Sequence, residues 1–104
     1  MNLDWNQQIE ELESRLQDLE RARNISNKYW GKPPPWVRGF LEHGSAEGAE
    51  DRVIIECAKW LTVVGFGRKD ICDKIWKSPL ADGYRKSNDK EKFILLVKEG
   101  WEKF

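Results

Sequence analysis

The sequence contains little of what an enzyme needs for catalysis. His43 is its only histidine and is followed directly by glycine, so it is better explained as an exposed side chain at a helix end than as a catalytic base. No Asp-x-Asp pair is present to hold two metal ions, and no Gly-x-x-x-x-Gly-Lys loop is present to bind a phosphate. These absences predict a binding module that is not an enzyme by itself and has no catalytic or metal-binding residues.

Cysteines and long apolar runs are also scarce. Cys57 and Cys72 fall on predicted helices without C-x-x-C spacing or a histidine partner, which favours buried, structural free thiols over a disulfide. The sequence shows no signal peptide and no apolar run long enough to cross a membrane. We therefore expect a cytoplasmic protein without a membrane partner.

A net charge of one sign is missing as well. The chain carries 18 basic and 18 acidic side chains, which excludes the uniform basicity of a histone-like binder. The charges are nevertheless separated along the sequence. Residues 1–20 carry six acidic side chains and one basic side chain, whereas residues 21–38 carry five basic side chains and no acidic one. A basic surface formed by residues 21–38 would suit an anionic partner.

What the sequence does contain is apolar residues at helical spacing. The most hydrophobic run, Glu50–Val64, predicts a central helix that ends at Gly65 and is covered by neighbours on several sides. The fold class that we expect is all-α, with one domain folded as a compact bundle of about five helices. Its parts are a long N-terminal helix over residues 1–27, a basic, aromatic and proline-rich connector over residues 28–35, and a helical core over residues 36–104.

Within the core we expect two further short helices and one last helix. The short helices cover residues 36–43 and 68–77, and Ile71 and Ile75 of the second point inward. Residues 78–87 read as a loop that contains the basic pair Arg85-Lys86. The last helix begins near Asn88, whose side chain would cap it together with Glu91.

The N-terminal helix carries a narrow apolar seam. Its residues follow the four-three spacing of a heptad: Trp5, Ile9, Leu12, Leu16 and Leu19. The seam lasts only about two heptads, fewer than the three or four that indicate a coiled coil. Packing against the domain's own core is therefore favoured, and self-association through this helix remains the alternative.

Aromatic residues are abundant, with six tryptophans, and one cluster of them is interleaved with basic residues. Aromatic rings stack on unpaired bases for about 1–3 kcal/mol each, and lysine and arginine neutralise phosphates. In the alternative interpretation, Trp30 and Trp36 only pin the proline-rich connector to the bundle, and both interpretations can hold together. The candidate nucleic-acid-binding residues are Lys28, Tyr29, Trp30, Lys32, Trp36, Arg38, Arg52, Lys59, Arg68 and Lys69.

A second candidate for nucleic-acid binding is the unit formed by residues 58–76. A helix, a glycine-containing turn and a basic second helix follow one another there, as in a helix-turn-helix, whose second helix enters a major groove. Two aspartates on that second helix reduce the positive charge that reading a groove requires. The residues that would read the bases are Lys69, Asp73, Lys74 and Lys77.

The pattern of residues 33–76 resembles the helical C-terminal module of archaeo-eukaryotic primases. The matching positions are Pro34-Pro35-Trp36-Val37-Arg38, Gly44, Glu47-Gly48, Trp60-Leu61 before Gly65, and Trp76. Trp36 stands where the primase large subunit has its first iron–sulfur cysteine, and the chain lacks the four cysteines that hold a cluster. The resemblance is therefore to the cluster-free branch: the helix bundle of archaeal plasmid primase-polymerases or the non-catalytic primase subunit.

This resemblance implies a non-catalytic helper in primer initiation during DNA replication. Such a module would bind the single-stranded DNA template, and ATP with magnesium as a bound nucleotide rather than a cofactor, beside a catalytic primase or polymerase subunit. A monomer is favoured. The alternatives are a protein-interaction adapter that docks or dimerises through the N-terminal helix, and a helix-turn-helix binder of duplex DNA.

Overall fold

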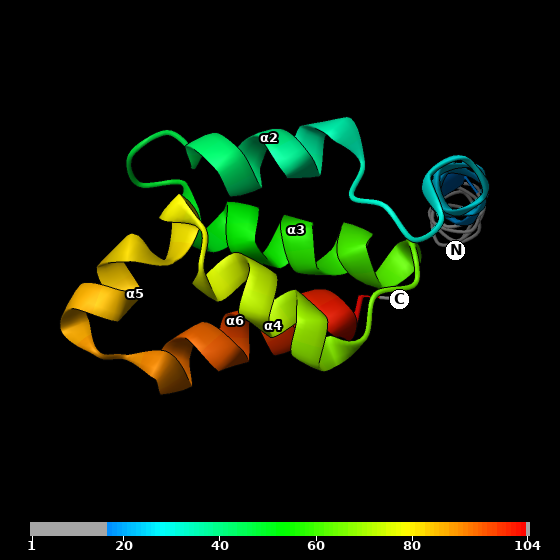
Figure 1. Ribbon diagram of the computed structural model, residues 1–104. Coiled ribbons are helices and arrows are strands. Elements are labelled where there is room, and N and C mark those ends of the chain that lie inside the picture. The colour runs from blue at the N-terminus through cyan, green and yellow to red at the C-terminus, as the bar shows by residue number, and fades with distance from the viewer. Residues whose placement is uncertain (1–16, 104) are drawn as a thin grey trace, which may run out of the picture.

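The computed structural model describes residues 17–103, and this part of the chain is helical without any strand (Figure 1). The all-α prediction is confirmed for these residues. Residues 17–29 form an N-terminal helical segment. The elements that follow are α2 (Pro35–His43), α3 (Glu50–Val63), α4 (Arg68–Trp76), the short 3-10 helix η1 (Pro79–Ala81), α5 (Asp82–Ser87) and α6 (Lys90–Trp101).

Helix α3 lies at the centre of the molecule, as its sequence predicts. It packs against α2, α4, η1 and α6, and Figure 1 shows α2 on one side of it and α4 with α6 on the other. Ile54, Ala58 and Leu61 have no exposed surface at all. The helix ends at Val63, and Gly65 then adopts a φ of +93°, a conformation that glycine reaches without a steric cost.

Helices α3 and α6 cross in tight contact at Gly100. A Cβ atom on Gly100 would lie 2.5 Å from the carbonyl oxygen of Ile55 and 2.6 Å from the Cβ of Ala58. Glycine is thus required at this crossing, because any side chain would force the two backbones apart. Phe93 and Val97 of α6 fill the core beside the crossing with almost no exposed surface.

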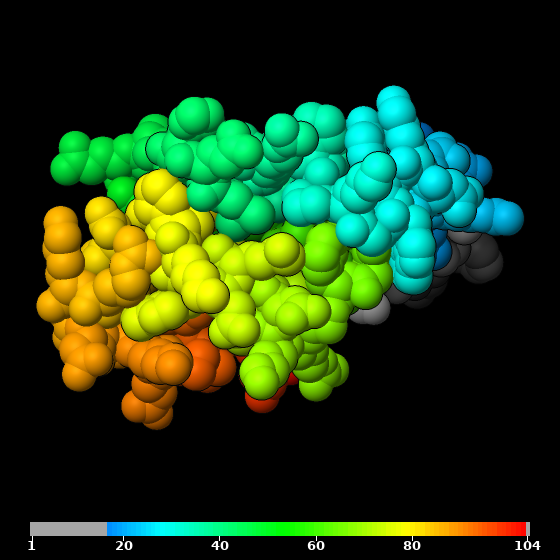
Figure 2. Space-filling view, viewed as in Figure 1, coloured from blue at the N-terminus to red at the C-terminus, as the bar shows by residue number. Residues whose placement is uncertain are grey.

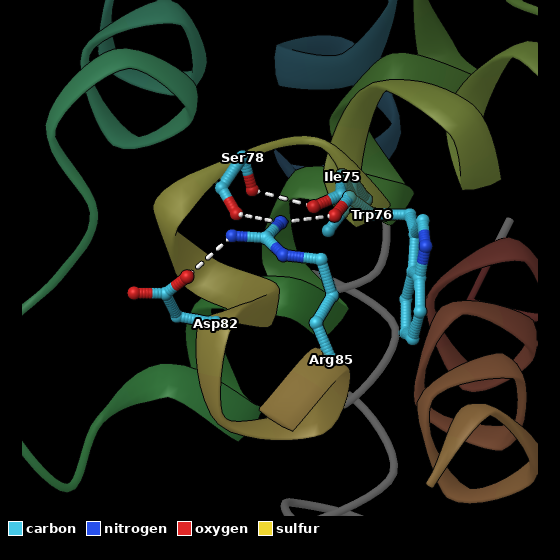
Figure 3. A network of polar contacts seen from close by, with 5 residues as sticks. All are labelled: Ile75, Trp76, Ser78, Asp82 and Arg85. Atoms are coloured by element: carbon cyan, nitrogen blue, oxygen red, sulfur yellow. Dashed lines mark hydrogen bonds and ion pairs between the residues drawn. The ribbon is translucent and has the colours of Figure 1, made fainter. Parts of the chain in front are cut away.

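The prediction of a loop over residues 78–87 is wrong, because this segment forms η1 and α5. The side chain of Arg85 holds the segment in place (Figure 3): it donates hydrogen bonds to the carbonyl oxygens of Trp76 and Ser78 and forms an ion pair with Asp82. The hydroxyl of Ser78 also donates to the carbonyl of Ile75, at 2.6 Å. Arg85 therefore satisfies the carbonyl of Trp76, the last residue of α4, and adds a second donor to the carbonyl of Ser78, which also accepts from the N–H of Ala81.

Two predicted boundaries also need correction. Helix α6 is capped by Asp89, whose carboxylate accepts from the backbone N–H of Lys92 at 3.3 Å, while Asn88 adopts a φ of +54° and ends α5. The connector is shorter than residues 28–35. Residues 28 and 29 are still helical, and Pro35 is already the first residue of α2, where its missing N–H carries no cost.

The N-terminal helical segment attaches to the core through its second half. Ala22 is buried and Ile25 packs against the core cluster. Leu19 is 57% exposed, so at this position the apolar seam does not pack on the domain's own core. The other seam residues, Trp5, Ile9, Leu12 and Leu16, lie outside the described residues.

Cys57 and Cys72 are both free thiols, as the sequence predicts, but only Cys57 is buried; Cys72 is partly exposed, contrary to the prediction. Cys57 is buried in α3, and this burial raises its pKa to about 12, with a further contribution from the nearby Glu56 carboxylate. The thiol of Cys57 is therefore protonated and unreactive at neutral pH. None of the helices within residues 17–103 is long and apolar enough to span a membrane.

Candidate functional site

Three aromatic rings form a row from the core to the surface, which we call the aromatic row: Trp60 of α3, Trp36 of α2 and Tyr29 of the N-terminal helical segment. Trp36 meets Trp60 edge-on, with ring centroids 5.9 Å apart, and Tyr29 meets Trp36 edge-on at 6.0 Å. Trp60 is only 7% exposed, whereas Trp36 is 39% exposed. The row is thus anchored in the core and offers ring surface at its outer end.

Cations lie over the rings of this row. The guanidinium carbon of Arg21 is 5.6 Å from the Trp60 ring centroid, and the ammonium of Lys59 is 4.8 Å from the same ring. The ammonium of Lys28 is 5.4 Å from the Tyr29 ring. These cation–π contacts hold positive charge beside the aromatic surface.

Trp30, which follows Tyr29 in the chain, packs its ring directly against Gly65. A Cβ atom on Gly65 would be 2.7 Å from Cζ2 of the Trp30 ring, so the ring rests directly on the backbone after α3. The backbone N–H of Gly31 donates to the carbonyl oxygen of Val64 at 2.8 Å and fixes the connector to the same turn. Trp30 nevertheless remains 65% exposed. The ring therefore pins the connector and also presents an open indole surface.

Two hollows flank Tyr29. The first hollow has a volume of about 540 Å³ and is bounded by the N-terminal helical segment and the row, with Gln17, Glu20, Arg21, Asn24, Ile25, Lys28, Tyr29 and Trp36 as its lining. The second hollow has a volume of about 550 Å³ and is lined by Tyr29, Lys32, Pro33, Pro35, Arg38, Gly39 and Glu42. The cyan part of the surface in Figure 2, around residue 30, marks this end of the molecule.

The structure gathers most of the predicted site residues at this end. Lys28, Lys32 and Arg38 lie at the two hollows with Tyr29 and Trp36, and Lys59 lies at the inner end of the row. Arg38 forms an exposed ion pair with Glu42, with Nε and Oε1 3.2 Å apart. Such an exposed pair contributes little free energy, so it does not prevent Arg38 from contacting a ligand.

Three predicted residues lie elsewhere. Arg52 is in the first turn of α3, about 12 Å along the helix axis from Trp60. The guanidinium of Arg68 lies over the Trp101 ring of α6, at 5.2 Å, and Lys69 follows it in the first turn of α4. None of the three lines either hollow.

Five residues of the first hollow are not among the predicted site residues: Gln17, Glu20, Arg21, Asn24 and Ile25. Gln17, Arg21, Asn24 and Lys28 are spaced by four, three and four residues, which places them on one face of the helix, and Glu20 lies beside Arg21 on the same side. This helical spacing of polar residues is the signal in the sequence that could have identified the lining of the first hollow. It was missed because a polar helix face with this spacing usually faces only solvent.

The other end of the molecule carries a third, acidic hollow, of about 340 Å³. Glu50, Asp51 and Asp82 line it together with Tyr84, whose hydroxyl donates a hydrogen bond to the carboxylate of Asp51. Burial raises the pKa of Tyr84, and so does this hydrogen bond. The phenol therefore stays protonated and engaged with Asp51. Negative charge at this hollow disfavours a polyanion.

The helix-turn-helix candidate has its two helices packed together. Ile71 and Ile75 of α4 are fully buried, as predicted. The exposed side of α4 carries Asp70 and Asp73 as well as lysines, and Lys74 lies over the Phe66 ring at 5.2 Å. This surface is mixed in charge and has no exposed aromatic ring beside its lysines comparable to Trp30 or Trp36.

The one histidine of the sequence lies at a helix end, away from the two hollows around Tyr29. His43 ends α2, and its side chain is 81% exposed. Within residues 17–103, no group of three or more histidine, cysteine, aspartate or glutamate side chains is placed to hold a metal ion. Apart from aliphatic residues, the side chains at the two hollows are thus aromatic rings, cations, amides and the two carboxylates of Glu20 and Glu42.

Comparison of the chain with protein-family models, with curated proteins and with solved structures finds no match. The resemblance to primase modules thus depends on the sequence motifs alone.

Proposed function

We propose that this chain is a non-catalytic module that binds single-stranded nucleic acid at the end that carries the aromatic row, Trp30 and the first and second hollows. The observation that carries the proposal is the exposure of Trp30 and Trp36, 65% and 39%, beside a group of cations. Indole surface left open to water next to lysine and arginine is the combination that binds unpaired bases and their phosphates.

Stacking supplies the contact with the bases. A base on the open surface of Trp30 or Trp36 would contribute about 1–3 kcal/mol, whatever its identity. The ring of Trp36 is held edge-on by Trp60 and Tyr29, and that of Trp30 rests on Gly65, so neither ring has to be ordered when the strand binds. Rings that are held in place before binding lose less conformational entropy on binding.

Cations around the hollows supply the contact with the phosphates. Arg21 and Lys28 line the first hollow, and Lys32 and Arg38 line the second hollow. If about four phosphates are neutralised, the logarithm of the binding constant should fall with the logarithm of the salt concentration with a slope of about −3. The neutral total charge of the chain does not exclude this, because cations outnumber carboxylates in the two hollows, four to two (Glu20 and Glu42), and the acidic hollow lies at the other end of the molecule.

The primase resemblance of the sequence supports a narrower form of the proposal. In that form the ligand is the DNA template during primer initiation, the neighbour is a catalytic primase or polymerase subunit, and ATP with magnesium is a second ligand. Pro34, Pro35 and Trp36, which carry part of the resemblance, lie at the start of α2 beside the second hollow.

The direct test is a salt titration of binding to labelled single-stranded oligonucleotides, followed by fluorescence anisotropy. Trp30→Ala should weaken binding by about tenfold through the loss of one stacking contact. The pair Lys28→Ala with Lys32→Ala should weaken binding by about tenfold at low salt and make the salt slope shallower by about 1.4.

The matched control is the pair Lys86→Ala with Lys92→Ala, which removes two exposed lysines from the other end of the molecule. It should change the affinity less than about twofold at moderate salt, because distant charges are screened. Equal losses from the two pairs, or an affinity that ignores salt, would contradict the proposal.

A second candidate function is a protein-interaction adapter that dimerises through the N-terminal helix. The exposure of Leu19, 57%, favours it. Sedimentation of the full chain distinguishes the two functions. A concentration-dependent dimer that Leu19→Lys dissociates, in a chain that binds no oligonucleotide, would replace the nucleic-acid proposal with the adapter.

A further inference from the structure

The first hollow has polar side chains that stacking and phosphate contacts leave unused. Glu20 and Asn24 lie one helical turn apart on the helix face that borders the hollow, and Gln17 precedes them by one turn. Among residues 17–103, no ion pair or hydrogen bond engages the side chain of Glu20 or Asn24. These groups are therefore available to a ligand that enters the hollow.

The aromatic side of the hollow would fix how a base lies in it. Tyr29 and Trp36 stand perpendicular to each other, with an interplanar angle of 89°. A base that stacks on one of these rings meets the edge of the other, so its orientation is limited. Its remaining edge faces the polar wall formed by Glu20 and Asn24. The volume of about 540 Å³ falls in the range of small-ligand sites.

A carboxylate in such a wall distinguishes bases by their hydrogen-bond donors. Ionised glutamate only accepts hydrogen bonds. Cytosine and adenine offer an exocyclic amino group to it, and guanine offers an amino group with the adjacent ring N–H. Thymine and uracil offer only the ring N3–H, which lies between two carbonyl oxygens, and those oxygens face a carboxylate unfavourably.

We propose that the first hollow is a base-selective subsite, in which Glu20 favours a base with an amino group and disfavours thymine and uracil. This inference rests on the proposed function and adds a sequence preference to it. Asn24, which both donates and accepts, supports the base edge beside Glu20, and Arg21 and Lys28 offset the carboxylate's repulsion of the neighbouring phosphates.

The test compares three labelled strands of about ten nucleotides, made only of deoxycytidine, only of thymidine or only of deoxyuridine. All three have one-ring bases, and deoxyuridine separates the effect of the thymine methyl group from that of the oxygen. The full chain should bind the cytosine strand at least about fivefold more tightly than either of the others.

Glu20→Gln should remove this preference, since an amide both donates and accepts. The matched control is Asp18→Asn, which removes the same charge from an exposed position of the same helix outside the hollow. Asp18→Asn should raise the affinity for all strands slightly and equally by removing a negative charge. Glu20→Gln should weaken the binding of the cytosine strand relative to the other two, because the carboxylate that accepts from the amino group is lost. Only Glu20→Gln should change the ratio between the cytosine and thymine strands.

The outcomes are distinct. A cytosine preference that Glu20→Gln alone abolishes supports the base-selective subsite. Equal binding of the three strands, or a preference that Glu20→Gln leaves unchanged, overturns it while single-strand binding stands. Failure to bind any of the strands overturns both this inference and the proposed function.

Discussion

Each end of the molecule has a tyrosine beside a hollow, and the balance of charge in the linings differs: four cations and two carboxylates around Tyr29, three carboxylates and no cation around Tyr84. Tyr29 borders the first and second hollows among Lys28, Lys32 and other cations. Tyr84 borders the acidic hollow and is hydrogen-bonded to Asp51. Lys92 approaches the Tyr84 ring at 5.8 Å, but the hollow itself is lined by carboxylates.

The difference shows why aromatic content alone does not indicate a binding site. Tyr84 packs on Phe93, which in turn packs on Trp76, so these rings fill the core and the phenol is tied to a carboxylate. Tyr29, Trp36 and Trp30 leave ring surface open beside positive charge. The same residue types stabilise the fold at one end and offer a surface to a ligand at the other.

The largest expected effect comes from breaking the α3–α6 contact on which both ends depend. Gly100→Ala places a methyl group 2.5 Å from the carbonyl oxygen of Ile55 and should lower the free energy of unfolding by about 3 kcal/mol. Denaturant unfolding followed by circular dichroism and by tryptophan fluorescence measures it. Coincident transitions would show that the two ends unfold together.

Gly83→Ala is the control for that substitution. Gly83 is also helical, but a Cβ atom there would meet nothing within 4 Å. The change should stabilise the protein by about 0.5–1 kcal/mol, because alanine is the better helix former. Similar losses from both variants would mean that the α3–α6 crossing is not the tight contact described above.

The next effect separates stability from binding at the acidic end. Arg85→Ala removes the hydrogen bonds to Trp76 and Ser78 and the ion pair with Asp82, and should cost about 2 kcal/mol. Lys86→Ala, at an exposed neighbouring position, should stay within about 0.5 kcal/mol. Thermal unfolding measures both, and oligonucleotide affinity should be unchanged for both. If folded Arg85→Ala loses affinity for oligonucleotides, binding is not confined to the end that carries the first and second hollows.

A smaller effect concerns the packing of the Trp30 ring against Gly65. Gly65→Ala and Gly48→Ala both place alanine at a positive φ and should each cost about 1–2 kcal/mol. Only at Gly65 would the methyl group meet the Trp30 ring, so only Gly65→Ala should also change the fluorescence of the folded protein and weaken oligonucleotide binding. Identical fluorescence in the two variants would show that Trp30 does not rest on Gly65.

The smallest expected effect concerns how the free energy of unfolding depends on pH through Tyr84, at the acidic end. Because the pKa of Tyr84 is raised in the folded protein, its phenol stays protonated there while the unfolded chain loses that proton near pH 10. The contribution of Tyr84 is thus complete below about pH 10 and is lost as the pH rises further.

Tyr84→Phe should cost about 1 kcal/mol at neutral pH, through the lost hydrogen bond to Asp51, and should reduce the loss of stability above about pH 10. Urea unfolding at several pH values measures this. If Tyr84→Phe loses as much stability above about pH 10 as the unchanged protein does, the raised pKa of Tyr84 is contradicted. Affinity for oligonucleotides at neutral pH should not change, since the second tyrosine, Tyr29, is intact.

The sequence predicted the features that depend on local patterns. The apolar spacing of Glu50–Val63 and the glycine after it identified the central helix and its end, and Ile71 and Ile75 were correctly placed inward. The clustering of Lys28, Lys32 and Trp36 was also foreseen, because these residues lie close together in the chain.

The features that were missed depend on contacts that carry no local pattern. Arg85 interacts with backbone carbonyls, which every sequence has, so nothing distinguished it from a basic residue in a loop. Gly100 looks like a weak helix residue until α3 is seen against it. Arg52 and Arg68 were grouped with the site by charge, although the fold places one far along α3 and the other over Trp101.

The packing of Trp30 against Gly65 has a consequence for tracing this protein's ancestry. A relative that keeps a large ring at position 30 also has to keep glycine at position 65, because a side chain there would occupy the place of the ring. The two positions are separated by more than thirty residues and should nevertheless vary together. Together with the glycine at position 100, this pair gives a three-point signature for recognising divergent family members whose overall sequence has drifted too far to align.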